Sequence, residues 1–424
     1  MQTFINPARD KWNELIRRTR MDDDVLKKNV SDILVDIKQN GDAAIKKYSL
    51  QFGKVHLNDL RVSEQEIEDA ITLVNDDLKN AIQIAKANIE KFHRSQKEDV
   101  IKVETTSGVW CWRKSVAIDK VGLYIPGGTA PLFSTLLMLG IPATIAGCRE
   151  IIVCTPSDTN GKVNDVVLYV SWLLGLKNIY RIGGAQAIAA MAYGSATVPA
   201  VYKIFGPGNQ YVTCAKQLVN SEGIAIDMLA GPSEVAVYAD ENCNPSYVAA
   251  DLLSQAEHGV DSQMLLIATS EAILTSIQNQ VNLQIESLER KKIAEKALSN
   301  SCFTVMKNVN DAVDLLNEYA PEHLIIASDN AEELSAKVRN AGSVFLGHYS
   351  AESAGDYASG TNHTLPTNGY AKVYSGVSLD SFVKKITFQQ VNQEGLKNIG
   401  KTVQSMAEAE GLHAHSYAIK IRNP

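Results

Sequence analysis

Cysteine pairs and secretory features are what this sequence lacks. Its six cysteines are scattered and form no CxxC pair, which argues against a zinc site built from thiolates. The stretch MQTFINPARDKWNELIRR has no apolar core of the kind that a signal peptide needs, so a disulfide framework is not expected either. We expect a cytoplasmic enzyme whose thiols are incidental. The cysteines are Cys111, Cys148, Cys154, Cys214, Cys243 and Cys302.

A strong charge of either sign is also missing. The net charge of -7 over 424 residues gives no reason to expect nucleic acid or an anionic membrane as a partner. Two uncharged runs, residues 121–148 and 182–202, could suggest membrane spans, but proline interrupts both of them. Such breaks would leave backbone groups unpaired in lipid. We interpret both runs as buried core.

The order of apolar runs predicts the fold class. From residue 120 onward, short apolar runs alternate with helical patterns, which is typical of α/β units with mainly parallel strands. The first hundred residues are predicted to be helical, with a capping box at Ser63 and Glu66. Residues 100–118 are predicted to be β-rich, and a small helical tail is predicted after Ser378. The expected strands are VGLYI, IIVC, IYRI, VYKIF, VAVYA, MLLIA, CFTVM and LIIAS.

No GxGxxG and no Walker A motif is present, so P-loop nucleotide hydrolysis is unsupported. Three strand-to-helix corners are nevertheless rich in glycine: YIPGGTA (124–130), RIGGAQA (181–187) and IFGPGNQ (204–210). Glycine lets a backbone approach a phosphate, and a helix that starts there favours an anion. One such corner would more often be structural, whereas three on successive units indicate a ligand crevice. The spacing alone does not identify a dinucleotide.

Histidine is scarce, so the surroundings of its eight copies are informative. In SQAEHG, Gln255 and His258 are three residues apart and would share one face of a helix. They are either a solvated surface or half of a metal site. Glu322 and His323 follow a proline and precede the run LIIAS. Adjacent residues of an extended segment point to opposite sides, which predicts one functional group and one bystander. A carboxylate and an imidazole are equally natural general bases.

Further histidines and carboxylates lie toward the C-terminus. Asp356 and His363 fall in a glycine-rich stretch, where an acidic residue can serve only as a turn former. His413 and His415 are two apart and would share a face if extended, or they are solvated. Taken together, these clusters offer nitrogen and oxygen ligands without sulfur. That donor set is typical of zinc or manganese.

Long motifs then carry a resemblance to a known family. The segment IDMLAGPSEVAVYADENCNPSYVAADLLSQAEH, residues 226–258, closely resembles the signature block of the histidinol dehydrogenases. Other motifs match that family in the same order, so the resemblance covers essentially the whole chain. They are VGLYIPGG, RIGGAQAIAA, KIFGPGN, PEHLII, GSVFLG, ESAGDYASGTNHTLPT and AEAEGLHAH.

The resemblance implies an activity and an architecture. Histidinol dehydrogenases oxidise L-histidinol to L-histidine through L-histidinaldehyde, a four-electron reaction that uses two NAD and one zinc ion per site. The expected assembly is a homodimer with shared active sites. The fold implied is two incomplete Rossmann-like domains, the first from residues 23–122 and 233–377 and the second from residues 123–232. A helical segment (1–22) precedes them, and a tail (378–424) reaches the partner subunit.

The resemblance also assigns roles at the centre of the site. It makes Glu322 and His323 the proton acceptors. The zinc ligands it implies are Gln255, His258, Asp356 and, from the partner subunit, His415.

Contacts to the organic ligands are implied in the same way. Tyr124, Gln186 and Asn209 match the NAD contacts, one from each glycine-rich corner. His363 is expected to contact or support the substrate site, and the role of His413 stays open. The substrate contacts implied are Ser233, Gln255, His258, His323, Asp356, Glu410 and His415.

Three other interpretations remain. An aldehyde dehydrogenase with a cysteine nucleophile would use Cys111 or Cys148, although neither lies in a site-like motif. A zinc- or nucleotide-binding module without catalysis would not require the adjacent Glu322 and His323. An enzyme of the same kind that acts on another amino alcohol is the strongest of the three.

Overall fold

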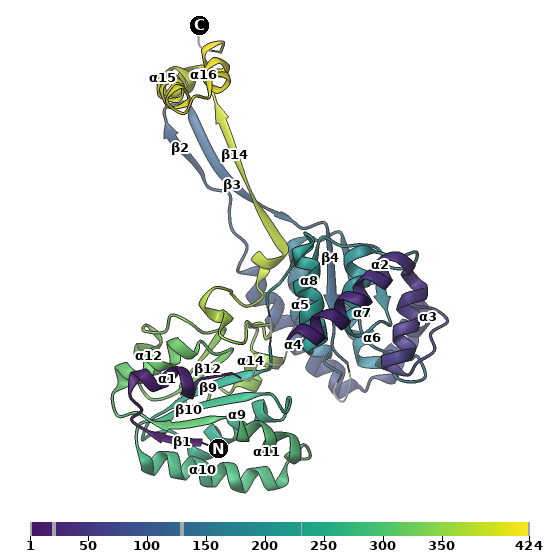
Figure 1. Ribbon diagram of the computed structural model, residues 1–424, viewed down its shortest axis with the longest axis vertical. Coiled ribbons are helices and arrows are strands. Elements are labelled where there is room, and N and C mark those ends of the chain that lie inside the picture. The colour runs from purple at the N-terminus through teal and green to yellow at the C-terminus, as the bar shows by residue number, and fades with distance from the viewer. Residues whose placement is uncertain (1, 19–22, 128–130, 230, 423–424) are drawn as a thin grey trace.

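The computed structural model describes residues 2–18, 23–127, 131–229 and 231–422, and it contains two helix-covered parallel sheets and a projecting arm (Figure 1). The expected α/β class with mainly parallel sheets is confirmed. All eight apolar runs predicted as strands form strands. None of the helices in the described part of the chain is long and apolar enough to cross a membrane.

The first sheet, sheet A, has six parallel strands in the order β1-β11-β10-β9-β12-β13. The side chains of β9 alternate between two cores, as the period of a strand requires. Val235 and Val237 pack under α9–α11, whereas Ala236 and Tyr238 pack under α1, α12 and α13. The strands are β1 (Gln2–Ile5), β9 (Glu234–Ala239), β10 (Gln263–Ala268), β11 (Cys302–Val305), β12 (His323–Ala327) and β13 (Ser343–Leu346). The helices are α1 (Trp12–Leu15), α9 (Pro245–Ala256), α10 (Glu271–Gln284), α11 (Lys291–Ser299), α12 (Val309–Tyr319) and α13 (Ala331–Ser335).

The second sheet, sheet B, has five parallel strands in the order β6-β5-β4-β7-β8. Helices α3–α6 cover one face, and α2, α7 and α8 cover the other. The strands are β4 (Lys120–Tyr124), β5 (Glu150–Cys154), β6 (Asn178–Tyr180), β7 (Lys203–Phe205) and β8 (Ala225–Ile226). The helices are α2 (Asp23–Gly53), α3 (Glu64–Leu73), α4 (Asp76–Arg94), α5 (Phe133–Ala146), α6 (Asp165–Leu173), α7 (Gly184–Tyr193) and α8 (Gln210–Ser221).

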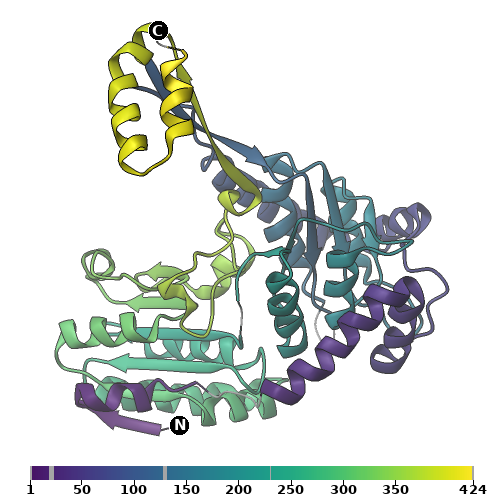
Figure 2. The same cartoon turned by 45° about the horizontal axis from the view of Figure 1, so that its top comes forward.

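The N-terminal helices pack differently from our expectation. We expected residues 23–122 to join residues 233–377, but α2, α3 and α4 lie on sheet B (Figure 2). Ile37 and Ile45 of α2 share a fully buried core with Ile188 of α7, so the apolar face of the helix determines its place. The segment 1–22, expected to be helical, contributes β1 to sheet A before its short helix.

The arm consists of a three-stranded antiparallel sheet, β14-β3-β2, and two helices, and it projects from the body (Figures 1 and 2). The tail after Ser378 was expected to be mostly helical, and this is wrong for its first part, because β14 pairs with β3 over nine residues. The arm elements are β2 (Lys102–Thr106), β3 (Val109–Ala117), β14 (Val383–Val391), α15 (Gln393–Ala409) and α16 (His413–Lys420). A further helix, α14 (Glu352–Tyr357), follows β13, and short 3-10 turns span Arg9–Lys11, Ile285–Ser287, Tyr370–Lys372 and Leu379–Phe382.

Candidate active site

The centre of the site is at the amino end of β12. Helix α12 ends where Ala320 adopts a left-handed conformation (φ 51), and the chain turns through Pro321 into the strand. Both Glu322 and His323 are buried there, and the distance between Glu322 Oε2 and His323 Nδ1 is 3.7 Å. Strand alternation would send the two side chains to opposite sides, but Glu322 precedes the strand, and both side chains lie close together.

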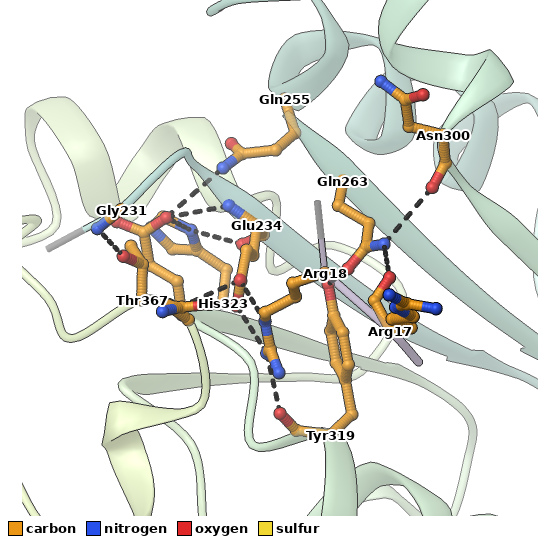
Figure 3. A network of polar contacts seen from close by, with 12 residues as sticks. Arg17, Arg18, Gly231, Glu234, Gln255, Gln263, Asn300, Tyr319, His323 and Thr367 are labelled. Carbon is orange, nitrogen blue, oxygen red and sulfur yellow. Dashed lines mark hydrogen bonds and ion pairs between the residues drawn. The ribbon is translucent and has the colours of Figure 1, made fainter. Parts of the chain in front are cut away.

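One neighbouring residue contacts both side chains through its backbone. The N–H of Glu234 donates to Glu322 Oε2 (2.9 Å), and the carbonyl of Glu234 lies 3.2 Å from His323 Nδ1 (Figure 3). A carbonyl only accepts, so Nδ1 is the nitrogen that donates. The other ring nitrogen, Nε2, is therefore directed into the site.

Two further carboxylates face the imidazole from α14. Glu352 and Asp356 are four residues apart, which places both on one face of this helix. Glu352 Oε1 lies 3.8 Å from His323 Nδ1, and Asp356 Oδ1 lies 3.4 Å from Nε2. The imidazole is thus enclosed by three acidic side chains.

Three buried polar atoms in this cluster lack hydrogen-bond partners among the described residues: His323 Nε2, Glu352 Oε2 and Asp356 Oδ1. Leaving such an atom unsatisfied costs about 1–3 kcal/mol, so the arrangement indicates a ligand. Potential ligand atoms of the three residues lie within 4.8 Å of one another. One imidazole and two carboxylates suit zinc or manganese.

Burial and crowding shift the acidities of these groups. Burial raises the pKa of Glu322 to about 7 and that of Glu352 to about 8. Burial lowers the pKa of His323, but the charges of Glu352, Glu322 and Asp356 outweigh it and raise that pKa to about 10. Such opposed shifts in one enclosed cluster are typical of functional sites.

The two residues predicted to share a helix face differ in position. Gln255 is buried in the last turn of α9, where its amide can donate to Glu352 Oε1 (2.5 Å) and accept from the N–H of Glu234 (2.8 Å). The helix ends at Ala256, so His258 lies in the following turn and is exposed. The surrounding protein lowers the pKa of His258, and the charge of Asp356 opposes this effect, which places the two side chains in the same neighbourhood.

His363 supports the site from behind. Its Nδ1 lies 2.8 Å from the carbonyl of Asp356, and its Nε2 lies 3.1 Å from Thr135 Oγ1. Both ring nitrogens therefore have protein partners. Such contacts hold the backbone of Asp356 and tie α14 to α5.

The predicted residues of the tail lie elsewhere in this chain. Glu410 and His415 are exposed near the tip of the arm, away from β12 and α14 (Figure 1). Ser233 is partly exposed directly before β9, next to Glu234. The structure therefore brings Gln255, Glu352, Asp356 and the Glu322–His323 pair together, places His258 on the exposed turn after α9, and leaves the arm residues apart.

The three predicted NAD contacts lie at the carboxyl edge of sheet B. Tyr124 ends β4, and its hydroxyl accepts from the N–H of Gly184 (3.0 Å). Gln186 is buried in the first turn of α7, and exposed Asn209 caps α8 through its side chain. Gly206 has φ 126, and a Cβ there would collide with the carbonyl of Tyr124, so only glycine fits this corner. The described parts of the three corners thus meet at one edge, and residues 128–130 of the first corner lie outside the described residues.

Sequence reasoning missed Glu234 and Glu352 as members of the site. Both stood in quoted motifs, GPSEVAVYA and ESAGDY, but nothing in a motif distinguishes a buried acid from a solvated one. The only usable signals were the position of Glu234 at the start of an all-apolar run and the four-residue spacing of Glu352 and Asp356.

The alternative cysteine nucleophiles find no support, since burial raises the pKa of Cys148 to about 11 and Cys111 lies on the arm strand β3.

Comparisons with known proteins identify the family of this chain. The family profile described as histidinol dehydrogenase matches residues 16–423. A histidinol dehydrogenase of Bacteroides thetaiotaomicron is 56% identical over 422 residues, which is 100% of this chain and 99% of that protein. One from Bacteroides fragilis is 55% identical with the same coverage. The crystal structure of histidinol dehydrogenase from Elizabethkingia anophelis superposes with a TM-score of 0.98 at 55% identity, covering 100% of this chain and 98% of that one. By sequence and by fold, this chain belongs to the histidinol dehydrogenase family.

Proposed function

We propose that the chain oxidises L-histidinol to L-histidine in two steps, with L-histidinaldehyde held between them, and that it reduces two NAD and uses one zinc ion per site. The observation that carries this proposal is the meeting of two adjacent bases, Glu322 and His323, with the unpartnered buried oxygen of Asp356 at the amino end of β12. A site for binding alone would not need both bases. Tyr124, Gln186 and Asn209 are the proposed NAD contacts, and NAD, when bound, accepts the hydride of each oxidation.

The metal would be held by Gln255, His258 and Asp356, with His415 supplied by a second copy of the chain. Asp356 Oδ1 fits this role because it is buried and unpartnered, and the donor set contains only nitrogen and oxygen. In this position the metal would act as a template that orients histidinol against the two bases. Ser233, His323 and Glu410 are the remaining proposed substrate contacts.

The two bases would divide the proton transfers. His323 donates from Nδ1 to the carbonyl of Glu234, which leaves Nε2 to accept the hydroxyl proton of histidinol. Glu322 keeps one carboxylate oxygen for a water molecule, since its other oxygen accepts from the N–H of Glu234. It takes a proton from the water that attacks the aldehyde, and the resulting hydrate is then oxidised to the acid.

The assembly proposed is a homodimer of the cytoplasm in which each arm completes the site of the partner. The support is the exposure of His415 and Glu410 on an arm that extends away from the body of its own chain (Figure 2). An active site that depends on the arm needs a second copy to receive it.

A stoichiometric assay tests the reaction. The purified chain with limiting histidinol should form two NADH per substrate, and a chelator should abolish the activity whereas thiol alkylation should not. One NADH per substrate, or loss of activity on alkylation alone, would contradict the proposal. A panel of other amino alcohols tests the specificity, and preferential turnover of one of them would reassign the substrate.

A further inference from the structure

A buried ion pair lies behind the catalytic pair. Arg18, from the N-terminal segment, donates through Nε and Nη2 to both carboxylate oxygens of Glu234 at 2.5 and 2.8 Å (Figure 3). Nη2 also donates to the carbonyl of Tyr319 (2.8 Å), and the guanidinium lies 4.3 Å from the centre of the Tyr319 ring. The side chains of Arg18 and Glu234 are only 17% and 3% exposed.

The carboxylate of Glu234 is held from a second direction. The backbone N–H of Asn368 donates to Glu234 Oε1 at 3.0 Å. Charges this deeply buried persist only with close partners and several hydrogen bonds. Arg18 and Asn368 come from opposite ends of the chain, so they fix the carboxylate between two separate segments.

The peptide groups of Glu234 contact different residues from those that its side chain contacts. They bind Glu322 Oε2 and His323 Nδ1, as described above. Glu234 is the first residue of β9, where it pairs with Gln263 of β10, and the ladder to β12 starts beside it at the pair Val235 and His323. The side chain of Glu234, clamped by Arg18, therefore adds to the sheet in holding the peptide groups that contact both bases.

We propose that Arg18 and Glu234 are a positioning pair for the catalytic residues, which hold Glu322 and His323 in their working orientation without contacting the substrate. The pair keeps the carbonyl of Glu234 opposite His323 Nδ1, and this fixes the tautomer in which Nε2 is free to act as a base. This inference rests on the proposed roles of Glu322 and His323.

The pair has a matched control in the same segment. Arg9 also forms a two-pronged ion pair with sheet A, to Asp311 (2.7 Å) and Asp314 (2.6 Å) of α12, but Arg9 is 63% exposed. Both arginines thus attach the N-terminal segment to the same domain, and of the two only Arg18 contacts Glu234, whose peptide groups contact the catalytic pair. A role limited to attaching this segment would let either substitution change the stability of the protein but neither kcat nor the tautomer of His323.

The experiment uses three variants of the zinc-loaded, full-length protein. Two carry a single substitution, Arg18→Lys or Arg9→Lys. The third, a doubly neutral variant, carries both Arg18→Met and Glu234→Gln. Lysine keeps the charge of Arg18 but cannot form the fork of two parallel hydrogen bonds. We expect Arg18→Lys to lower kcat for histidinol about 10–100-fold, the range found for residues behind a metal-site ligand, and to change KM less than about threefold. Arg9→Lys should leave both constants unchanged.

The second measurement follows the tautomer of His323 by the ¹⁵N shifts of its ring, assigned with His323→Gln. The parent and Arg9→Lys should show the Nδ1–H form, and the two Arg18 variants should show a mixture. If a folded Arg18→Lys protein kept the parent kcat and a pure Nδ1–H ring, the positioning role would be wrong. Should the doubly neutral variant not fold, Arg18→Lys alone decides. The ring measurement needs no substrate, so it also separates a failure of this inference from a failure of the proposed substrate.

Discussion

Three carboxyl groups and one imidazole share the buried space at the end of β12, and their charges depend on one another. Burial favours the neutral form of Glu322 and Glu352, whereas His323 is stabilised as a cation by the acids around it. A divalent cation bound beside Asp356 would offset part of the negative charge of the acidic side chains around His323. The neutral imidazole, which a base requires, is then favoured.

The first prediction at the residue scale concerns pH. Glu322 must be ionised to take a proton from water, and burial raises its pKa to about 7. The rate of histidinaldehyde oxidation should therefore rise with pH up to about 7 and fall about tenfold per pH unit well below that value. Single-turnover rates with supplied aldehyde between about pH 5.5 and pH 9 measure this. A rate that stays constant down to pH 5.5 would show that Glu322 is not the group that titrates.

A second prediction separates the two bases. Replacing His323 with alanine should slow both oxidations by about 10²–10⁴-fold, because the imidazole accepts a proton in each. In contrast, Glu322→Gln should slow the oxidation of supplied histidinaldehyde by a similar factor and that of histidinol to the aldehyde by less than about tenfold. NADH formation from each substrate is the measurement. If the Glu322→Gln variant oxidised histidinaldehyde at the parent rate, the assignment of water activation to Glu322 would be wrong.

At the scale of elements, a buried ion pair holds the glycine corner between β7 and α8. Lys216 pairs with Asp227 and donates to the carbonyl of Gly206 (2.9 Å), while Asp227 Oδ2 accepts from the N–H of Gly206 (2.8 Å). The side chains of Lys216 and Asp227 are 4% and 1% exposed. The corner is thus fixed through both of its backbone polar groups.

The third prediction is that Lys216→Met destabilises sheet B. It leaves Asp227 buried without its partner, and breaking a pair of this kind costs about 3–5 kcal/mol. Urea or thermal unfolding should show a lower midpoint. The control is Arg149→Met, which removes an exposed pair with Asp119 and should change the midpoint little. Equal midpoints for both variants would mean that the buried pair contributes no net stability.

The strands differed in how far the sequence could predict them. The eight predicted runs lie in strands of sheets A and B whose two faces are buried, so their residues are almost all apolar. Strand β14 lacks this pattern because most of it is exposed. Its apolar residues Val383, Ile386, Phe388 and Val391 have spacings that also suit a helix.

The site was predictable in its residue types and less so in its geometry. Long motifs identified Glu322, His323 and Asp356, but the burial of Glu234 and Glu352 depends on segments far away in the chain, which no local pattern contains. Likewise, the end of α9 at Ala256 separates Gln255 from His258, although their spacing suits a helix. Helix ends of this kind are set by tertiary contacts as much as by propensity.

At the scale of the whole molecule, the arm presents apolar side chains to solvent. An arm of this composition is expected to bury them against another surface. The proposed dimer supplies such a surface and brings His415 of one copy toward Asp356 of the other. The exposed apolar residues are Val103, Trp110, Ile386, Phe388, Val391, Met406, Leu412, Tyr417 and Ile421.

The fourth prediction follows from a shared site. Chains with His258→Ala and chains with His415→Ala should each be inactive, because each lacks one proposed metal ligand. After subunit exchange, a heterodimer should regain one intact site, because one interface then carries both native histidines. Recovered NADH formation, up to about half the parental rate per heterodimer, is the expected result.

Native mass spectrometry of the exchanged mixture provides the control. If heterodimers form from folded chains and the mixture stays inactive, the arm acts on its own chain or not at all. Exchange between two copies of His258→Ala should give no activity under the same conditions.

The pairing of β1 with β11 limits when this part of sheet A can form during synthesis of the chain. Gln2 lies opposite Cys302 in sheet A, so β1 has its neighbour only after 300 more residues have been made. At ordinary elongation rates this takes roughly 15–60 s. Sheet B, whose strands all lie between residues 120 and 226, can close during that interval. The N-terminal segment therefore cannot dock on sheet A until β11 has been made, and a nascent chain halted before β11 should have an undocked, protease-sensitive β1 segment beside an already folded sheet B.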